Sequence, residues 1–406
     1  MSLPYWLEVP LVEGASSIPD PETEIVIIGS GLAGVSTAYW LQTKGFNSIT
    51  LIDFKATEAA SFRNCGHILY GTVESILALA ALHGDAIAKD LWQLSIDICH
   101  DVRDTVQREG LDVDYKQDGY LVMAVDESEH DEIRGSIKLL HSHGFQSDYV
   151  SRKELENKGF CNVMGGRFEA GSAQAHPTKF RNALLELCLK RGLRYHSNIE
   201  VLAVDEVKDK VAITTRHHGV LRAEAAVIAA NAYSPLLSHF FAKHQLVEPF
   251  RGQIICSKPL SKPLRVTYPH SFDHGYEYAI ATQDNRLMLG GWRNNTTGGE
   301  TGTYDITPNP LVKKGLEAFA VRHYAIEEKI EWEYSWAGIM AASKTGFPFI
   351  GPTDSQRIFT VSGFTGHGFS WAHGSAKYLA AIMAGDSIPD LVARQFNPRL
   401  APLTRT

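Results

Sequence analysis

Residues 23–54 read "TEIVIIGSGLAGVSTAYWLQTKGFNSITLIDF", and this stretch decides the fold. Its β-branched run "EIVIIG" is typical of a buried parallel strand. The run passes into the glycine-rich turn at 29–34, after which "VSTAYWLQTKG" has the composition of a helix that ends at Gly45. A second run, "SITLID", predicts another strand that ends on Asp53. This order of elements predicts the first unit of a doubly wound α/β domain.

The glycine spacing predicts a dinucleotide-binding turn. Gly29 permits the tight turn, Gly31 lets the backbone approach a pyrophosphate, and Gly34 lets the helix lie close to the strand. The first turn of the helix offers free N–H groups to the phosphates, and an acid about twenty residues later suits a ribose. The cofactor-binding residues expected here are Gly29, Ser30, Gly31, Leu32, Ala33, Gly34, Asp53 and Phe54. The pattern alone fits NAD and FAD equally well.

A second glycine-rich helix start lies at the far end of the chain. Residues 363–385, "GFTGHGFSWAHGSAKYLAAIMAG", predict a loop that enters a long helix. A nicotinamide dehydrogenase does not require such an element. A flavin gains from it, because the ring takes negative charge on reduction and a helix N-terminus stabilises that charge. The second helix start therefore favours FAD.

Composition limits the class of protein and its partners. The chain has 406 residues, which predicts two domains, and its net charge of -7 argues against nucleic acid or an anionic membrane as a partner. Five cysteines without a CxxC pair, together with no secretory pattern at the start, predict a cytoplasmic protein. No run of apolar residues is long enough to predict a membrane span. No metal site is expected, since Cys65 and His67 alone cannot supply enough ligands.

Seven segments occur in an order that resembles the FAD-dependent D-amino acid oxidase (DAO) superfamily, which includes glycine oxidase and sarcosine oxidase. The sequence is also similar to gamma-glutamylputrescine oxidases, which share the "NAY" and "GHG" elements. The resemblance spans roughly residues 22–390. The seven segments are "IVIIGSGLAGVSTAYWL", "ASFRNCG", "HPTKF", "VIAANAYSP", "FRGQI", "WAGI...SKTGFPFIG" and "GFTGHGFSWAHGSAKYLA".

The resemblance implies a fold in which two domains are interleaved along the chain. A Rossmann-like α/β domain that binds FAD would take residues 1–85, 148–234 and 333–406. An α+β substrate-binding domain, built on a mixed sheet, would take residues 86–147 and 235–332. Further contacts with FAD are implied for Ser61, Arg63, Asn64, Cys65, Gly66, Val201, Ala230, Asn231, Gly338, Gly363, Thr365, Gly366, His367 and Gly368.

The resemblance also implies a reaction and its partners. Members transfer a hydride from a carbon that bears an amine to flavin N5, and water hydrolyses the resulting imine. In oxidases O2 then reoxidises the flavin and gives H2O2, whereas dehydrogenases use another electron acceptor. The expected function is oxidation of a small-molecule amine. The alternatives are an FAD-dependent amino-acid dehydrogenase or oxidase, of the D-amino acid or N-methyl glycine type, and a flavin-binding subunit without turnover of its own.

Three departures from the family pattern bear on the substrate and the acceptor. Met340 stands where glycine oxidase-like members carry an arginine for the substrate carboxylate, which favours an amine, although Arg293 in "GGWRNN" could replace that arginine. Met288 stands where sarcosine oxidase-like members carry the lysine that activates oxygen, which leaves both oxidase and dehydrogenase open. The segment "WAGIMAA" has no cysteine for a covalent link, so noncovalent FAD is expected.

The remaining candidates lie on segments that should border the flavin ring. The residues expected at the reacting centre are His67, Trp336 and His367, and those expected in the substrate pocket are Tyr276, Tyr278, Trp292, Arg293 and Met340. His67 could contact the substrate, contact the flavin or carry a covalent bond to it. Cys65 is expected to be a small packing residue and not a nucleophile.

Overall fold

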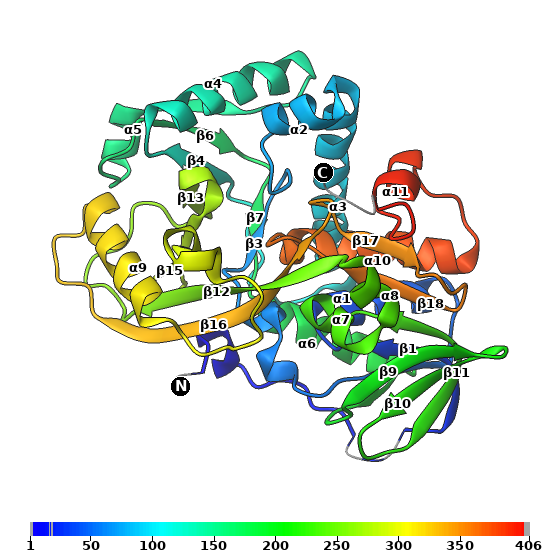
Figure 1. Ribbon diagram of the computed structural model, residues 1–406. Helices are drawn as coiled ribbons and strands as arrows, with labels where there is room; N and C mark the ends of the chain where they lie inside the picture. Colours follow the sequence, from blue (N-terminus) through cyan, green and yellow to red (C-terminus); the bar gives the residue numbers. More distant parts are fainter. Residues whose placement is uncertain (1–2, 16, 18, 402–406) are drawn as a thin grey trace.

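The computed structural model describes residues 3–15, 17 and 19–401, and its core consists of two eight-stranded mixed sheets (Figure 1). Sheet A has the order β17-β18-β11-β1-β2-β8, with β10 paired to β11 and β9 to β10. Its strands are β1 Glu22–Ile28, β2 Ile49–Ile52, β8 Arg194–His196, β9 Val201–Val207, β10 Lys210–Thr215, β11 Val220–Ile228, β17 Phe349–Pro352 and β18 Ile358–Ser362.

Sheet B has the order β16-β12-β15-β14-β13-β4-β6-β5 and lies beside sheet A in Figure 1. Its strands are β4 Tyr120–Ala124, β5 Asp148–Ser151, β6 Gly165–Glu169, β12 Val247–Ser257, β13 His270–Phe272, β14 Glu277–Ala281, β15 Leu287–Gly290 and β16 Trp332–Ser343. A short two-stranded sheet pairs β3 His67–Ile68 with β7 Ala173–Gln174. The α-helices are α1 Leu32–Thr43, α2 Ile76–His83, α3 Asp85–Glu109, α4 Glu127–Ser142, α5 Arg152–Asn157, α6 Pro177–Lys190, α7 Ser234–Leu237, α8 His239–His244, α9 Pro310–His323, α10 Gly368–Ala384 and α11 Asp390–Gln395.

The centre of sheet A is a parallel sheet, as the opening sequence predicts. β1 pairs in parallel with β2 and β11, so Ile28 lies opposite both Ile52 and Ile228. β18 continues the parallel set beside β11. All these strands therefore end at one edge, which is where ligands bind in doubly wound sheets. The fold expected for the cofactor domain, a Rossmann-like α/β sheet next to a second mixed sheet, is confirmed.

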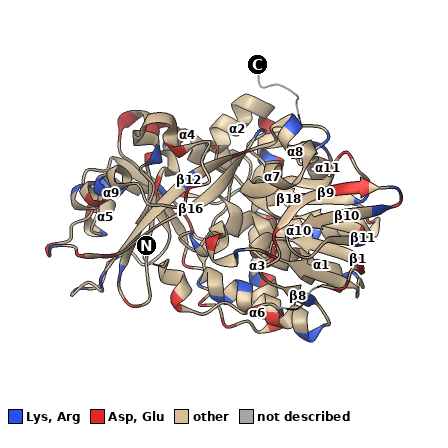
Figure 2. Cartoon of the chain, turned by 60° about the horizontal axis from the view of Figure 1, so that its bottom comes forward, with Lys and Arg blue, Asp and Glu red and all other residues tan. Residues whose placement is uncertain are grey.

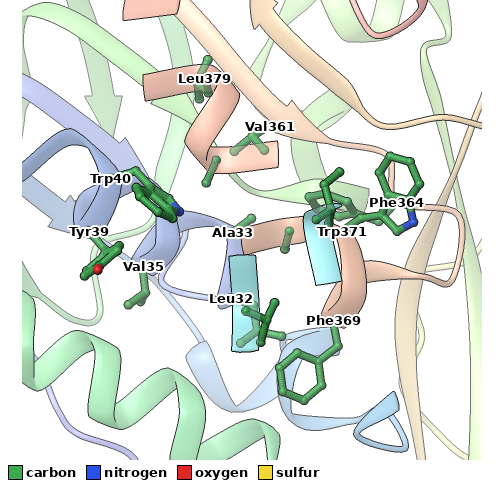
Figure 3. Close-up of a cluster of buried hydrophobic side chains, with 14 of the residues drawn as sticks. Leu32, Ala33, Val35, Tyr39, Trp40, Val361, Phe364, Phe369, Trp371 and Leu379 are labelled. Carbon is green, nitrogen blue, oxygen red and sulfur yellow. The ribbon is translucent and has the colours of Figure 1, made fainter. Parts of the chain in front are cut away.

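Helices α1, α6 and α10 cover one face of this sheet and form the largest apolar core. α1 is buried along most of its length, and Figure 3 shows Leu32 and Ala33 near Phe369 and Trp371 of α10. Burial of a Leu or Phe side chain contributes roughly 1.5–3 kcal/mol, so this core holds the two helices firmly together. The N-termini of α1 and α10 are thereby fixed at the same edge of sheet A.

Some segments that the resemblance assigned to the FAD domain supply strands to sheet B. Residues 148–169 supply β5 and β6 to sheet B, and β16 also belongs to sheet B. Helix α3, expected in the substrate domain, packs on α10 and contributes to the core around α1. The domain boundaries themselves stay a prediction.

The distribution of charged side chains on the surface does not indicate where a ligand binds. Lys, Arg, Asp and Glu are scattered over both halves of the molecule and do not gather on one face (Figure 2). Among the described residues, no helix combines the length and the apolar character needed to cross a bilayer. The five cysteines are free thiols.

Candidate functional site

A cavity of about 1050 Å³ runs from the carboxyl edge of sheet A to one face of sheet B. Its size and its position at the ends of parallel strands are those of a ligand site in this type of sheet. The lining contains most of the expected residues: Gly29, Gly31, Leu32, Ala33, Asp53, Phe54, Ser61, Arg63, Asn64, Cys65, His67, Val201, Ala230, Asn231, Tyr276, Tyr278, Arg293, Gly338, Met340, Thr365, Gly366, His367 and Gly368.

The turn at the end of β1 requires its glycines. Gly29 has a φ of +107°, which side-chain-bearing residues rarely adopt. A Cβ on Gly34 would lie 1.8 Å from the Gly29 carbonyl oxygen, so α1 can approach β1 only without a side chain there. A Cβ on Gly31 would meet Ser61 Oγ at 2.7 Å, and this hydroxyl accepts the Leu32 N–H at 2.9 Å. The turn thus presents bare backbone at the start of a helix, which fits a pyrophosphate.

Asp53 follows β2 and helps to fix this turn. Its carboxylate accepts the Ser30 N–H at 2.6 Å, and burial raises the pKa of Asp53 above its usual value. The fully buried Arg181 of α6 donates to the Ser30 carbonyl and hydroxyl oxygens at 3.0 Å each, and its charge opposes the rise in the Asp53 pKa. Arg181 was not among the expected residues, and its only signal was its place just after "HPTKF".

The loop before α10 brings a second helix N-terminus to the cavity. The side chain of Asn231 accepts the Gly363 N–H at 2.9 Å, which ties the loop to the end of β11. The Thr365 N–H donates to the Ala341 carbonyl oxygen at 2.9 Å, and Thr365 Oγ1 accepts the Ser343 N–H at 3.1 Å. The same loop is therefore held by both sheets, and it carries the start of α10 to the point where they meet. The geometry of both helix starts fits FAD, because its pyrophosphate is negatively charged and its ring takes negative charge on reduction.

Residues 63–65 line the cavity in a loop that ends at Gly66. Arg63 donates from Nη1 to the Ala337 carbonyl oxygen at 2.6 Å, which anchors β16 to the loop. The Asn64 side chain accepts the Gly66 N–H at 2.7 Å and donates to the Ser61 carbonyl oxygen at 2.9 Å, so it shapes the loop itself. Cys65 is buried, and burial raises the pKa of its thiol well above the usual value. A thiol held protonated in this way is a poor nucleophile.

His67 begins β3 and faces the cavity beside sheet B. Its Nε2 lies 3.2 Å from the Ala279 carbonyl oxygen, which fits an Nε2–H donor, and its ring meets Tyr278 edge to face at 6.1 Å. Burial, aided by repulsion from His270 and His367, lowers the pKa of His67 to about 3. Burial also lowers the pKa of His367. Both imidazoles are therefore neutral at physiological pH.

The opposite wall carries the expected substrate-pocket residues of sheet B and its loops. The Arg293 guanidinium lies 4.5 Å from the Phe250 ring centre and 5.2 Å from that of Tyr276, and Nη1 donates to the Gly299 carbonyl oxygen at 3.4 Å. Met340 points from β16 toward Gly252, where an added Cβ would meet its Cε at 2.4 Å. The wall thus combines one cation with aromatic and thioether surface.

Three residues that the sequence associated with the reacting centre, the substrate pocket or oxygen activation, namely Trp336, Trp292 and Met288, are not in the cavity lining. Trp336 is fully buried and donates from Nε1 to the Arg63 carbonyl oxygen at 3.2 Å, so it supports the loop from outside the cavity lining. Trp292 turns its indole onto α9, where a Cβ on Gly315 would lie 2.0 Å from Nε1. Met288 is buried in the same apolar cluster as Trp336. Four expected residues shape the cofactor end from outside the lining, namely Ser30, Gly34, Gly66 and Gly363.

The cavity also has a lobe that the sequence did not predict. It is lined by residues of β4, α4 and β6 and by the chain leading to α2, among them Tyr120, Glu129, Glu132 and Arg167. These residues come from segments without a recognisable motif. Among the described residues, no group of three or more His, Cys, Asp or Glu side chains is placed to hold a metal ion.

Comparison with known proteins places this geometry in a family. The DAO family of FAD-dependent oxidoreductases matches residues 24–382. D-amino acid dehydrogenase 1 of Mesorhizobium japonicum is 24% identical, over 91% of this chain and 98% of its own. Gamma-glutamylputrescine oxidoreductase of Escherichia coli is 23% identical, over 90% of this chain and 84% of its own. The crystal structure of glycine oxidase from Geobacillus kaustophilus superposes with a TM-score of 0.75 at 21% identity, covering 95% of this chain and 99% of that one. The chain is an enzyme of the DAO family of FAD-dependent oxidoreductases, as its sequence motifs predicted, and FAD is its cofactor.

Proposed function

We propose that this enzyme oxidises the CH–NH bond of a small-molecule amine to an imine, with O2 as the electron acceptor and H2O2 as the product. FAD, when bound, supplies the hydride acceptor. The observation that carries the proposal is that the groups around His67 are neutral. His67 lies in the cavity beside sheet B. His67 and His367 are neutral, and Tyr278 and Met340 add apolar surface.

The neutral, partly apolar part of the wall around His67, which does not include Arg293, acts on the protonation state of an amine. Burial disfavours the ammonium form, so the pKa of a bound amine falls and the free base that can lose a hydride becomes available. The role of the wall is then to hold the reacting C–H bond and exclude water, which needs no general base. The resemblance to gamma-glutamylputrescine oxidoreductase supports an amine as the substrate class.

Arg293 supports a second candidate, oxidation of an amino acid. Arg293 lines the cavity, and within residues 3–15, 17 and 19–401 its guanidinium has a single hydrogen bond, which is long at 3.4 Å, so it is available to a carboxylate on the reacting carbon. The resemblance to a D-amino acid dehydrogenase agrees with this alternative. For this second candidate function, Arg293 would bind the substrate carboxylate, which Met340 cannot do.

Anaerobic reduction of the purified holoenzyme tests these proposals together. We expect an amine from a panel of primary and secondary amines to bleach the flavin, and admission of air to restore the colour with formation of H2O2. Bleaching by α-amino acids alone would favour the second candidate. Restoration only with an artificial acceptor would identify a dehydrogenase. If neither amines nor amino acids bleach the flavin, the chain is a flavin-binding subunit without turnover of its own.

The FAD is proposed to be noncovalent. The thiol of Cys65 is buried and protonated, and the His67 Nε2 is engaged with a backbone carbonyl group. Acid precipitation should therefore release the flavin into the supernatant, whereas yellow colour that stays with the pellet would contradict the proposal. The five free thiols suit a reducing compartment, and we propose a cytoplasmic location.

A further inference from the structure

A row of paired residues leads from the proposed reacting centre into the second lobe of the cavity. Tyr278 pairs with Ser271, Ser271 with Val122, and Val122 with Arg167. Directly paired residues lie on the same face of a sheet, and all four line the cavity. Three strand spacings separate the first from the last, which is about 14 Å. The row therefore forms a continuous floor on which an extended ligand could lie.

Arg167 is the last residue of this row, and its guanidinium is buried with few hydrogen-bond partners. The residue is only 8% exposed, and its guanidinium lies over the Trp92 ring at 5.3 Å. Its Nη1 lies 3.2 Å from Glu169 Oε1, but the two groups are not aligned as a hydrogen bond. Among the described residues, none accepts a hydrogen bond from Nε or Nη1 of Arg167. These two nitrogens are enclosed by protein, and a buried guanidinium without acceptors is costly. Arg167 also lines the cavity, where a ligand carboxylate would bring a counter-charge to this guanidinium.

The two carboxylates that α4 brings to this lobe have partners. Both carboxylate oxygens of Glu129 accept backbone N–H groups, at 2.9 Å from Val125 and 2.6 Å from His274. Glu132 forms an ion pair with His274 at 3.2 Å and accepts the Ser75 hydroxyl. Glu169 is not part of the cavity lining, whereas Arg167 is. Of the described residues that line this lobe, Arg167 and Ser136 have buried polar atoms without a hydrogen-bond partner, and Arg167 is the charged one of the two.

We propose that Arg167 is the recognition residue of a distal subsite that binds a carboxylate at the non-reacting end of the amine substrate. This inference rests on the proposed function and narrows its substrate class to amines that carry a carboxylate several bonds from the oxidised carbon. A single carboxylate suits the site better than a phosphate dianion, because Glu129 and Glu169 would repel the second negative charge. Arg293 serves a different position, since it would bind a carboxylate on the reacting carbon.

Paired substrates test the subsite. The probes are ω-amino carboxylates from 4-aminobutanoate to 8-aminooctanoate, each compared with the n-alkylamine of the same length by flavin reduction in the holoenzyme. We expect at least one amino carboxylate to exceed its alkylamine by about 30-fold or more in kcat/KM, the effect of one buried charge pair. Arg167→Met should remove this preference. The ratio is measured within each variant, so a general loss of folded enzyme cancels.

Two further variants protect the test against misfolding. Arg167→Met leaves Glu169 buried without a counter-charge, so the double variant Arg167→Met/Glu169→Gln, which removes both charges, should fold better and also lack the preference. Arg152→Met is the matched control, because this arginine has a side chain that is 62% exposed on α5. A preference that survives in both Arg167 variants, or that disappears in Arg293→Met instead, would overturn the proposal.

A binding measurement separates the subsite from the proposed function. Hexanoate and octanoate, with hexan-1-ol as the neutral control, are titrated into the holoenzyme while flavin absorbance and Tm are recorded. Carboxylate binding that depends on Arg167, without flavin reduction by any amine, would support the subsite and refute amine oxidation. Flavin reduction by amines without any carboxylate preference or carboxylate binding would refute the subsite alone.

Discussion

The two ends of the cavity are built from different groups. The cofactor end consists of backbone N–H groups, glycines and two helix starts, fixed by Asp53, Arg181 and Asn231. The other end, which we propose to hold the substrate and call the substrate end, consists of side chains on sheet B, with His67 at the boundary. Backbone groups give one end a fixed chemistry for phosphate and flavin, whereas side chains let the other end vary. The difference explains how one family keeps FAD and changes its substrates.

The most severe disruption is expected at the cofactor end from Gly34→Ala. The added methyl group would lie 1.8 Å from the Gly29 carbonyl oxygen, so α1 must move away from β1. We expect a loss of about 3 kcal/mol in the free energy of unfolding and protein without bound flavin. Thermal unfolding and the flavin-to-protein absorbance ratio measure both effects. Thr43→Ala, at the other end of α1, should retain the flavin, and yellow Gly34→Ala protein would contradict the close packing described above.

At the substrate end, Arg293→Ala separates amines from amino acids. If the substrate bears a carboxylate on the reacting carbon, kcat/KM should fall about 100-fold, or about 3 kcal/mol, while a simple amine should be little affected. The exposed Arg322 of α9 supplies the control, as Arg322→Ala. Equal losses with both substrate classes would show that Arg293 acts on the protein and not on a carboxylate.

Arg181→Met is expected to weaken FAD binding through the support of the glycine turn. It removes the donors to Ser30 and lets the pKa of Asp53 rise further, at a cost of about 2 kcal/mol, or about 30-fold in the Kd of FAD. Fluorescence titration of the apoprotein with FAD measures this change. Arg191→Met, next to the same helix but with a side chain 37% exposed, should bind FAD normally. Unchanged affinity in Arg181→Met would mean that the turn is fixed by its glycines alone.

His67→Gln tests whether the imidazole is neutral. Its expected effect, on the pH dependence of the free energy of unfolding, is the smallest of the four. The folded protein keeps His67 neutral down to about pH 3, whereas the unfolded chain binds the proton below about pH 6.5. Stability is therefore complete above pH 6.5 and falls as the pH decreases, by about 1–2 kcal/mol at pH 5 from this residue. Denaturant unfolding at pH 7.5 and 5.0 should show a smaller loss in His67→Gln than in the wild type. The control is His217→Gln at an exposed position, which should lose as much free energy of unfolding between pH 7.5 and 5.0 as the wild type.

The cofactor end could be predicted because its determinants are local in sequence. Gly29, Gly34 and Asp53 lie within 25 residues, and their spacing alone requires a turn, a close helix and a second parallel strand. The substrate end could not be predicted to the same degree. Trp336 and Met340 lie on the same strand, but the pairing of β16 with β12 and its contact with Arg63 decide which of them reaches the cavity. No local pattern encodes that choice.

Long-range pairing also explains the residues that sequence reasoning misplaced or missed. Trp292 adopts a left-handed backbone with a φ of +65°, which turns its indole away from the cavity and onto α9. Arg167 meets Trp92, which lies in α3 and on a different layer of the fold. Arg181 gave no signal beyond its position after "HPTKF", since its partners come from the turn that follows β1 and from β8. Each of these contacts depends on how distant segments meet.

Strand β16 has a consequence for how such an enzyme could acquire a new substrate. Gly338 lies against Arg63 and admits no side chain, because an added Cβ would meet the arginine at 2.8 Å. Two residues further on, Met340 lines the cavity and reaches toward Gly252. We therefore expect substitutions at position 340 to change the cavity without pressing on Arg63, whereas position 338 is closed to a side chain. The two positions share one face of the strand, and only position 340 leaves room for a new substrate to be selected.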